Sequence, residues 1–418
     1  MKKIAVVISR YGKEINGGAE LHARNVAEHL NEKYDVTVLT SCENDDSQTQ
    51  GVYYLKGNDK INDVKILRFE SQQKDKTNEN KTFRYLHKNS IFRRERFSLP
   101  NFIKLAVKKI KYRSKKNFDR IFEDWIETQG AYTPDLITYI KKNQNNYDTF
   151  IFFLYYHYTT YTGINEVANK SILVPIAHDD PALCLISFDK VFASARFIMY
   201  NSLSEKEWVE KLHPVAKNAI SDIVGVGCER PRISLASEEQ PKINFPYFVY
   251  IGRIHESKGC STMFEYFKYY KQQYNNDIKL VLIGKNFMGQ VDNSEDIIYT
   301  GFISEQKKYH YLQNAIALII PSPYESLSIV TLEAMAMGKP VLANGHCDIL
   351  KKHIELSHAG YFYYNKKEFC EALYKLATLN EKEKEAMAQN GISYVEGNYD
   401  WKVVIGKYIK VIENIGKS

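Results

Sequence analysis

This 418-residue sequence lacks long apolar runs and paired cysteines. No apolar run approaches the about 18 residues that a membrane-spanning helix needs, and the start MKKIAVVISRYGKE turns polar too early for a signal peptide. The six cysteines include no CxxC pair, which argues against a zinc site and a disulfide framework. We therefore expect a cytoplasmic protein without a metal site.

The length and the charge distribution suggest two domains and one unusual basic segment. A chain of 418 residues is too long for one core. Residues 81–120 hold fourteen Lys or Arg against Glu95 and Asp119, although the whole chain carries a net charge of only +7. Within this segment, 101–112 predicts a basic amphipathic helix, which suits an anionic membrane surface. A solvated face over core contacts and a nucleic-acid patch are the alternatives.

Residues 321–345, PSPYESLSIVTLEAMAMGKPVLANG, predict a strand end followed by a helix of about three turns. The apolar run 315–320 before them is typical of a strand buried on both faces, and two prolines then end it. Ser326 or Ser328 is the expected helix cap, and Gly338 with Pro340 marks the helix end.

The start of this helix has the features of a diphosphate site. Unpaired amides from Leu327 to Val330 offer N–H donors and partial positive charge. Glu325 precedes them and Glu333 lies eight residues later, a rise of at most roughly 12 Å in a helix. Carboxylates on either side of a diphosphate suit the hydroxyls of a nucleotide sugar.

The E-x7-E pattern, the Pro-Ser-Pro-Tyr before it and the Ala-Met-Gly-Lys-Pro-Val after it together resemble the retaining GT-B glycosyltransferases of the group 4 type, also called glycosyl transferases group 1. Two glutamates at this spacing occur by chance in many helices, so the residues around them carry the resemblance. An amphipathic helix with two solvated glutamates is the alternative. The resemblance implies that Glu325 binds sugar hydroxyls, that Glu333 binds the ribose, and that Ser326, Leu327 and Ser328 also contact the donor.

A second match follows the predicted strand 247–251, in the sequence GRIHESKG. Arg253 and Lys258 present two cations from one loop, and a departing diphosphate requires such neutralisation. They resemble the phosphate-binding pair of the family, with Gly252 beside them, and an exposed basic turn is the alternative. The resemblance also implies that backbone groups at Gly284, Phe302 and Ile303 carry the nucleobase.

The first half of the chain predicts a further set of alternating strands and helices. Strand 4–9 leads into Gly17-Gly18-Ala19-Glu20, a helix and the strand 36–40. The loop has a Gly-Gly pair but no G-x-G-x-x-G motif, and no acidic residue follows the second strand. Both observations argue against a dehydrogenase. In the family this loop lies over the donor phosphates, which implies a role for Gly17 and Gly18; a plain tight turn is the alternative.

Two histidines follow buried strands in this half. His178 comes after 172–177 and resembles the family's histidine that approaches the donor sugar, which makes it a catalytic candidate with Glu325, Arg253 and Lys258. His157 follows 148–156, where an acceptor-side role and a simple structural role stay open.

We therefore expect an α/β protein of the GT-B fold with two facing Rossmann-like domains, 1–235 for the acceptor and 236–395 for the donor, and a closing helix, 396–418, that crosses back to the first. The expected activity is retaining sugar transfer from a UDP-, GDP- or dTDP-sugar to a glycan or lipid-linked acceptor in cell-surface polysaccharide or lipopolysaccharide synthesis, at the inner face of the cell membrane. We expect no metal and no specific nucleic acid, and we assign Glu325 a positioning role. A nucleotide-sugar epimerase of the same fold, and an RNA-binding protein that uses the basic segment, are the alternatives.

Overall fold

The computed structural model describes residues 1–15, 17–44, 54–75, 77–89, 115–178, 181–230, 243–289, 294–325 and 327–415. The chain divides into two compact units. Unit 1 comprises Met1–Val224 and Ile405–Ser418, and unit 2 comprises Gly225–Val404. The boundaries expected at 235 and 395 stay predictions. No helix among these residues is long and apolar enough to cross a bilayer.

Unit 1 is built on an eight-stranded sheet in the order β3-β4-β2-β1-β5-β6-β7-β8. Its pairs are parallel, except that β3 runs antiparallel to β4 at one edge. The order reverses between β1 and β5, so the loops after these two strands lie at the switch point of the sheet. The strands are β1 (Lys3–Val7), β2 (Asp35–Ser41), β3 (Gly57–Ile61), β4 (Val64–Phe69), β5 (Thr149–Phe153), β6 (Ser171–Val174), β7 (Phe197–Tyr200) and β8 (Ile220–Ile223).

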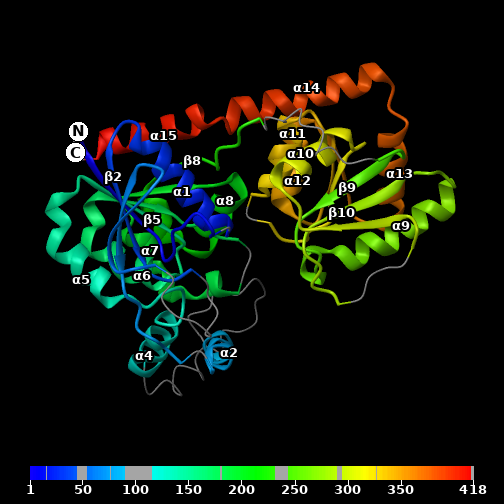
Figure 1. Ribbon diagram of the computed structural model, residues 1–418. Helices are drawn as coiled ribbons and strands as arrows, with labels where there is room; N and C mark the ends of the chain where they lie inside the picture. The colour runs from blue at the N-terminus through cyan, green and yellow to red at the C-terminus, as the bar shows by residue number, and fades with distance from the viewer. Residues whose placement is uncertain are drawn as a thin grey trace. The chain divides into compact units, whose positions relative to one another are not determined.

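Helices cover both faces of this sheet (Figure 1). On one face, Phe150 and Phe152 of β5 and Phe122 and Trp125 of α4 belong to the same large aromatic core. The β5 sequence TFIFF is buried at every position, because helices lie on either side of it. The α-helices are α1 (Gly18–Asn31), α2 (Glu79–Asn89), α4 (Lys115–Ile126), α5 (Pro134–Asn143), α6 (Tyr158–Gly163), α7 (Asp189–Ser194) and α8 (Leu203–Leu212).

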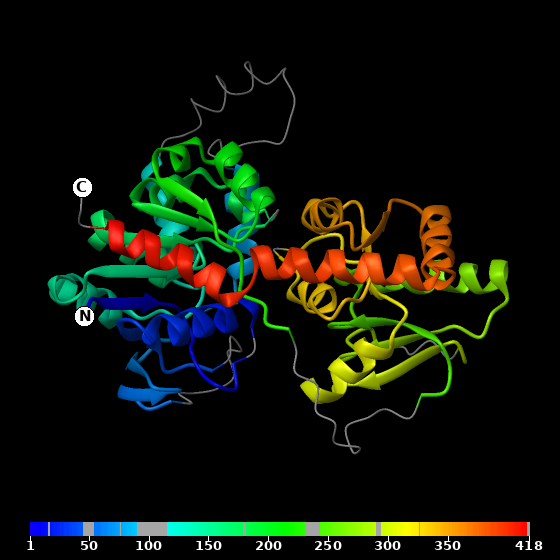
Figure 2. The ribbon, with the colours of Figure 1, turned by 90° about the horizontal axis from the view of Figure 1, so that it is seen from above.

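The C-terminal helix α15 (Trp401–Asn414) returns to unit 1, and Figure 2 shows it beside the first strand. Glu413 accepts a hydrogen bond from the Tyr34 hydroxyl at 2.7 Å, and Lys2 donates to the Ile412 carbonyl at 2.7 Å. Lys407 donates to the Ile223 carbonyl of β8 at 2.6 Å. These contacts tie the chain end to both the first and the last strand of the unit.

Unit 2 has a six-stranded parallel sheet in the order β11-β10-β9-β12-β13-β14. This is the doubly wound order 3-2-1-4-5-6, and its switch point lies between β9 and β12. The strands are β9 (Tyr247–Ile251), β10 (Lys279–Ile283), β11 (Ile297–Gly301), β12 (Leu318–Ile320), β13 (Val341–Asn344) and β14 (Gly360–Tyr363).

Alternate residues of these strands enter two cores. Val249 packs with residues of α11, α12 and α14, whereas Phe248 and Tyr250 pack with residues of α9 and α13 on the other face. The helices are α9 (Cys260–Tyr274), α10 (Glu305–Asn314), α11 (Ile329–Ala336), α12 (Asp348–Ser357), α13 (Lys366–Ala377) and α14 (Glu381–Asn398).

Some predicted elements differ from the observed ones. The helix after the two prolines has eight residues, about two turns instead of three. Ser328 is its N-cap residue, as one of the two predicted, but it is left-handed with φ 62° and makes no side-chain cap hydrogen bond. The edge strand β3, Gly57–Ile61, forms from a polar sequence that does not signal a strand. α13 and α14 are separate helices, because Asn380 forms a capping box that starts α14. The helix expected at 101–112 lies outside the described residues.

Candidate active site

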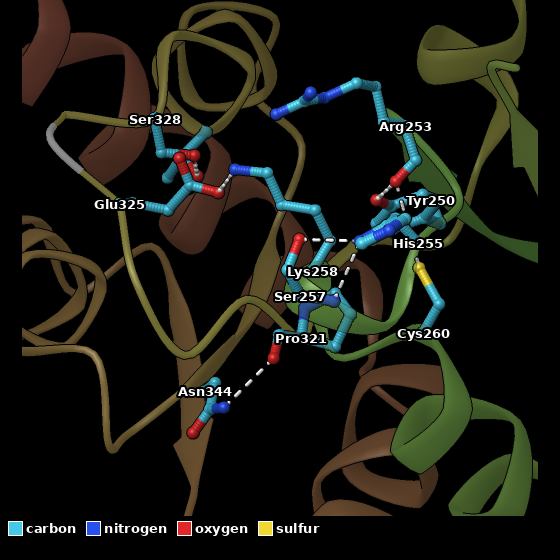
Figure 3. A network of polar contacts seen from close by, with 11 residues as sticks. Tyr250, Arg253, His255, Ser257, Lys258, Cys260, Pro321, Glu325, Ser328 and Asn344 are labelled. Atoms are coloured by element: carbon cyan, nitrogen blue, oxygen red, sulfur yellow. Dashed lines mark hydrogen bonds and ion pairs between the residues drawn. The ribbon is translucent and has the colours of Figure 1, made fainter. Parts of the chain in front are cut away.

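The loop after β9 places Lys258 against Glu325 at the switch point of the unit 2 sheet. The Lys258 Nζ lies 2.7 Å from the Glu325 Oε1, and both side chains are mostly buried, with exposed fractions of 25% and 17% (Figure 3). A short 3₁₀ turn, Glu256–Lys258, carries the lysine, and the His255 Nδ1 accepts from the Ser257 amide to start that turn. The two predicted residues therefore meet at the carboxyl ends of the two central strands.

Two glycines let this loop pack closely on its neighbours. Gly259 has φ 74°, and a Cβ there would lie 2.3 Å from the Pro321 carbonyl oxygen. Gly284 has φ 144°, and a Cβ there would lie 1.9 Å from the Gly252 carbonyl oxygen. These positions require glycine because backbone meets backbone. Packing alone thus accounts for Gly284, and its predicted contact with the nucleobase stays a prediction.

Arg253 supplies a second cation from the same loop. Its side chain is exposed and extends in Figure 3 toward the side where Lys258 meets Glu325. The Tyr250 hydroxyl donates to the Arg253 carbonyl at 2.7 Å and so fixes the backbone from which the side chain leaves. Two positive side chains near one carboxylate favour an anionic ligand here.

The segment after β12 is anchored from several sides. The Asn344 amide of β13 donates to the Pro321 carbonyl at 3.0 Å, and the Leu327 side chain is only 2% exposed. Ser328 is left-handed, and its hydroxyl pairs with that of Thr331 at 2.8 Å. The first amides of α11 therefore start from a backbone held in one conformation. Ser326, also predicted to contact the donor, lies outside the described residues.

Glu333 is held by two neighbours that the sequence did not suggest. The Lys308 Nζ of α10 lies 3.0 and 3.1 Å from its two carboxylate oxygens, and the Tyr309 hydroxyl donates to Oε1 at 3.1 Å. Burial, and then the Glu333 charge, raise the pKa of the Tyr309 phenol, so it stays a donor. Glu333 is thereby kept oriented on the first turns of α11.

Phe302 and Ile303 follow β11 at the same edge of the sheet. Phe302 is 86% exposed, whereas Ile303 packs against the core on the α11 face. An exposed aromatic ring at a strand end is available to a planar ligand. Its contact with a nucleobase remains a prediction.

Gly17 and Gly18 lie in unit 1, at the start of α1, and both are exposed. A Cβ on Gly17 would lie 2.1 Å from a carboxylate oxygen of Glu20, which folds back over it and pairs with Arg10 at 2.6 Å. Arg24 donates to the Gly12 carbonyl at 2.7 Å. The loop after β1 is therefore pinned before it reaches the two glycines.

A buried arginine anchors the same loop. Arg68 of β4 is 1% exposed and donates to the Tyr11 carbonyl at 2.9 Å and to Asp59 at 2.8 Å. Its guanidinium stacks on the Tyr54 ring at 3.7 Å. Nothing in the sequence around Arg68 distinguished it from a solvent-facing strand residue.

His178 is exposed at the end of the loop that follows β6. Buried Glu205 holds that loop, because its carboxylate accepts from the amides of Ala177 at 2.6 Å and Asn201 at 2.5 Å. The Ser202 hydroxyl caps α8 by accepting from the Glu205 amide at 3.1 Å. His157 is 5% exposed and precedes α6, where its backbone accepts the first helical bonds.

Within the described ranges, no group of three His, Cys, Asp or Glu side chains is placed to hold a metal ion. The residues that gather around Lys258 are instead suited to an anion, with two cations, helix amides and flanking carboxylates.

Residues 234–394 match the family described as "Glycosyl transferases group 1". This match covers most of unit 2. An uncharacterized glycosyltransferase of Methanocaldococcus jannaschii is 28% identical over 143 aligned residues, in an alignment that covers 29% of this chain. The chain spans only 36% of that relative.

Two solved structures share the fold of this chain. Sucrose-phosphate synthase from Thermosynechococcus elongatus has a TM-score of 0.66 at 13% identity, with 99% of each chain covered. Anabaena HepE in complex with UDP and glucose has a TM-score of 0.63 at 14% identity, with 99% of this chain and 100% of that chain covered. The likeness over full length shows the GT-B fold, with two parallel-sheet domains.

Proposed function

We propose that this protein transfers a sugar from a nucleotide-sugar donor to a glycan or lipid-linked acceptor, with retention, in the assembly of a cell-surface polysaccharide or lipopolysaccharide. The contact between Lys258 and Glu325 carries the proposal. It lies at the switch point of the unit 2 sheet, beside the amide end of α11, where α/β proteins bind ligands.

Each side chain has a distinct role in this proposal. Lys258 and Arg253 neutralise the charge that grows on the departing diphosphate, with the amides at the start of α11. Glu325 then exchanges its contact with Lys258 for the hydroxyls of the sugar. Glu333, held by Lys308, accepts from the ribose. His178 is proposed to act on the sugar from unit 1, with Gly17 and Gly18 beside the phosphates.

UDP-sugars are the donors to test first, since HepE was solved with UDP and glucose. The wild-type protein is incubated with UDP-, GDP- and dTDP-sugars, with and without lipid-linked glycan acceptors, and free nucleoside diphosphate is measured. Acceptor-dependent release supports transfer, and release without acceptor indicates an epimerase or a hydrolase. The proposal fails if no donor releases its nucleotide under any condition.

The proposed membrane contact rests on the sequence of the basic segment, most of which lies outside the described residues. Neutral residues at Arg93, Arg94, Lys108 and Lys109 should weaken binding to anionic liposomes at low salt. Neutral liposomes serve as the control. Unchanged partitioning of the fourfold variant would assign the segment to an ordinary solvated face.

A further inference from the structure

Buried His353 lies on α12 behind the segment that leads into α11. It is 3% exposed, with its Nε2 2.8 Å from the Leu327 carbonyl oxygen and its Nδ1 2.9 Å from the Tyr394 hydroxyl. A carbonyl oxygen only accepts, so Nε2 carries the proton and Nδ1 accepts from Tyr394. Burial lowers the pKa of His353 to about 4, which keeps this neutral form at ordinary pH.

The contact to Leu327 sets the direction of the next amide. A trans peptide unit is planar, so its C=O and N–H point in opposite directions, and no peptide bond in the described residues is cis. Because the Leu327 oxygen points to His353, the Ser328 N–H points away from α12. Ser328 is left-handed at φ 62°, a conformation that a residue with a side chain adopts only when its surroundings impose it.

Several contacts impose that conformation. The Leu327 side chain is anchored in the core, and the Ser328 hydroxyl pairs with Thr331 at 2.8 Å. If this peptide flipped, the Leu327 oxygen would turn toward the proposed phosphates and the buried His353 N–H would lose its acceptor. Both changes are unfavourable, since a buried donor without a partner and an oxygen facing an anion each cost free energy.

We propose that His353 is a positioning residue that holds the Ser328 amide ready to donate to the diphosphate of the donor. The inference rests on the proposed function and adds to it residues outside the predicted site. Tyr394 of α14 supports His353 by holding the required tautomer, and the Tyr394 hydroxyl lies 3.4 Å from that of Tyr399. The orientation of the phosphate-binding amides thus depends on packing between α12 and α14.

The test compares ligands with and without phosphates. His353→Phe keeps the ring and removes the N–H, so it should weaken binding of UDP about 10-fold or more and leave uridine binding unchanged, because one hydrogen bond to a charged group is lost. Isothermal titration measures both ligands. GDP with guanosine, or dTDP with thymidine, replaces them if the wild type prefers that base.

Matched variants separate orientation from stability. His310→Phe removes another buried histidine of unit 2, on α10, and should leave the UDP-to-uridine affinity ratio unchanged. His353→Gln retains an amide donor and should recover part of the ratio. Tyr394→Phe should lower the UDP-to-uridine affinity ratio by a smaller factor than His353→Phe does. Tyr270→Phe removes the hydroxyl of another buried tyrosine and should leave the ratio unchanged.

Equal weakening of UDP and uridine in the His353 variants would overturn the inference and assign His353 to folding alone. Wild-type affinities in both the His353→Phe and Tyr394→Phe variants would also overturn it. If His353→Phe does not fold, the UDP-to-uridine affinity ratios of His353→Gln and Tyr394→Phe test the inference in its place. Absence of any nucleoside diphosphate binding in the wild type would instead refute the proposed function.

Discussion

Lys258 is the side chain whose removal should most affect turnover. Lys258→Met removes the ammonium that is proposed to meet the leaving phosphate, and kcat should fall by roughly 100- to 1000-fold, as for other groups that stabilise charge in the transition state. Steady-state kinetics with the preferred donor measure the change. Lys366→Met, which removes an exposed lysine paired with Glu265, is the control and should keep its activity. Wild-type kcat in Lys258→Met would remove this lysine from the site.

Glu205 makes a prediction about pH and stability. Burial raises the pKa of its carboxyl to about 8 from an ordinary 4.5. Because the folded-state pKa lies above the unfolded one, protonated Glu205 contributes its full stabilisation of the folded state below about pH 4.5. This contribution is lost as pH rises to about 8. Glu205→Gln cannot titrate. In this pH window its unfolding free energy should therefore fall less steeply with pH than that of the wild type, by up to ~1.4 kcal/mol per pH unit.

Urea unfolding at several pH values between 5 and 8 tests this prediction. Exposed Glu207 lies on the same helix, so Glu207→Gln is a suitable control that should keep the wild-type slope. An unchanged slope in Glu205→Gln would mean that the backbone amides hold Glu205 ionised throughout.

Residues that act through their neighbours were harder to predict than residues in motifs. Lys258 and Glu325 stand in distinctive local sequences, and the structure brings them together. Lys308, His353 and Arg68 stand in ordinary ones, because their contacts come from elements far away in the chain. Glu205 also stands in an ordinary sequence, and sequence spacing does not show that β6 and β7 end beside it.

At the scale of elements, the turn between β9 and α9 determines how Lys258 approaches β12. Gly259→Ala should be more destabilising than Gly289→Ala, although φ is nearly the same, 74° and 75°. The strained φ alone costs about 1–2 kcal/mol. A Cβ at 259 would also meet the Pro321 carbonyl at 2.3 Å, whereas nothing lies within 4 Å of one at 289.

Thermal unfolding measures the two alanine variants side by side. Gly259→Ala should also reduce kcat/KM for the donor, because both Lys258 and the segment before Glu325 must shift. Equal melting temperatures for the two variants would show that the backbone around Gly259 and Pro321 accommodates a Cβ without loss of stability.

The order of elements was predictable from alternating apolar runs and helix signals, but several bounds were not. β9 coincides with the predicted strand 247–251, because the run YFVYI is buried almost throughout. α11 begins after Ser328, one of the two predicted caps, but the left-handed conformation of Ser328 and its missing side-chain cap are not signalled by the sequence. β3 was missed because GNDKI is polar and half exposed at the sheet edge.

For the whole molecule, sequence analysis and structure agree on two doubly wound sheets, each with its own switch point. Strands with apolar runs alternate with amphipathic helices, and this pattern predicts parallel sheets without knowledge of distant contacts. The predicted site residues divide between the units, with Gly17, Gly18 and His178 in unit 1 and the others in unit 2. Donor specificity was not predictable, since the base and the sugar are read by a few atoms.

A thermal-shift screen of UDP-, GDP- and dTDP-sugars tests the central claim most directly. A ligand at 100 times its Kd stabilises the native state by about 2.7 kcal/mol, so at least one donor class should raise the melting temperature by several degrees. The same donor should raise the melting temperature of Lys258→Met less than that of the wild type. It should raise that of Lys366→Met by as much as that of the wild type. If no nucleotide sugar at millimolar concentration shifts the wild-type protein, the claim that it binds a nucleotide-sugar donor is contradicted.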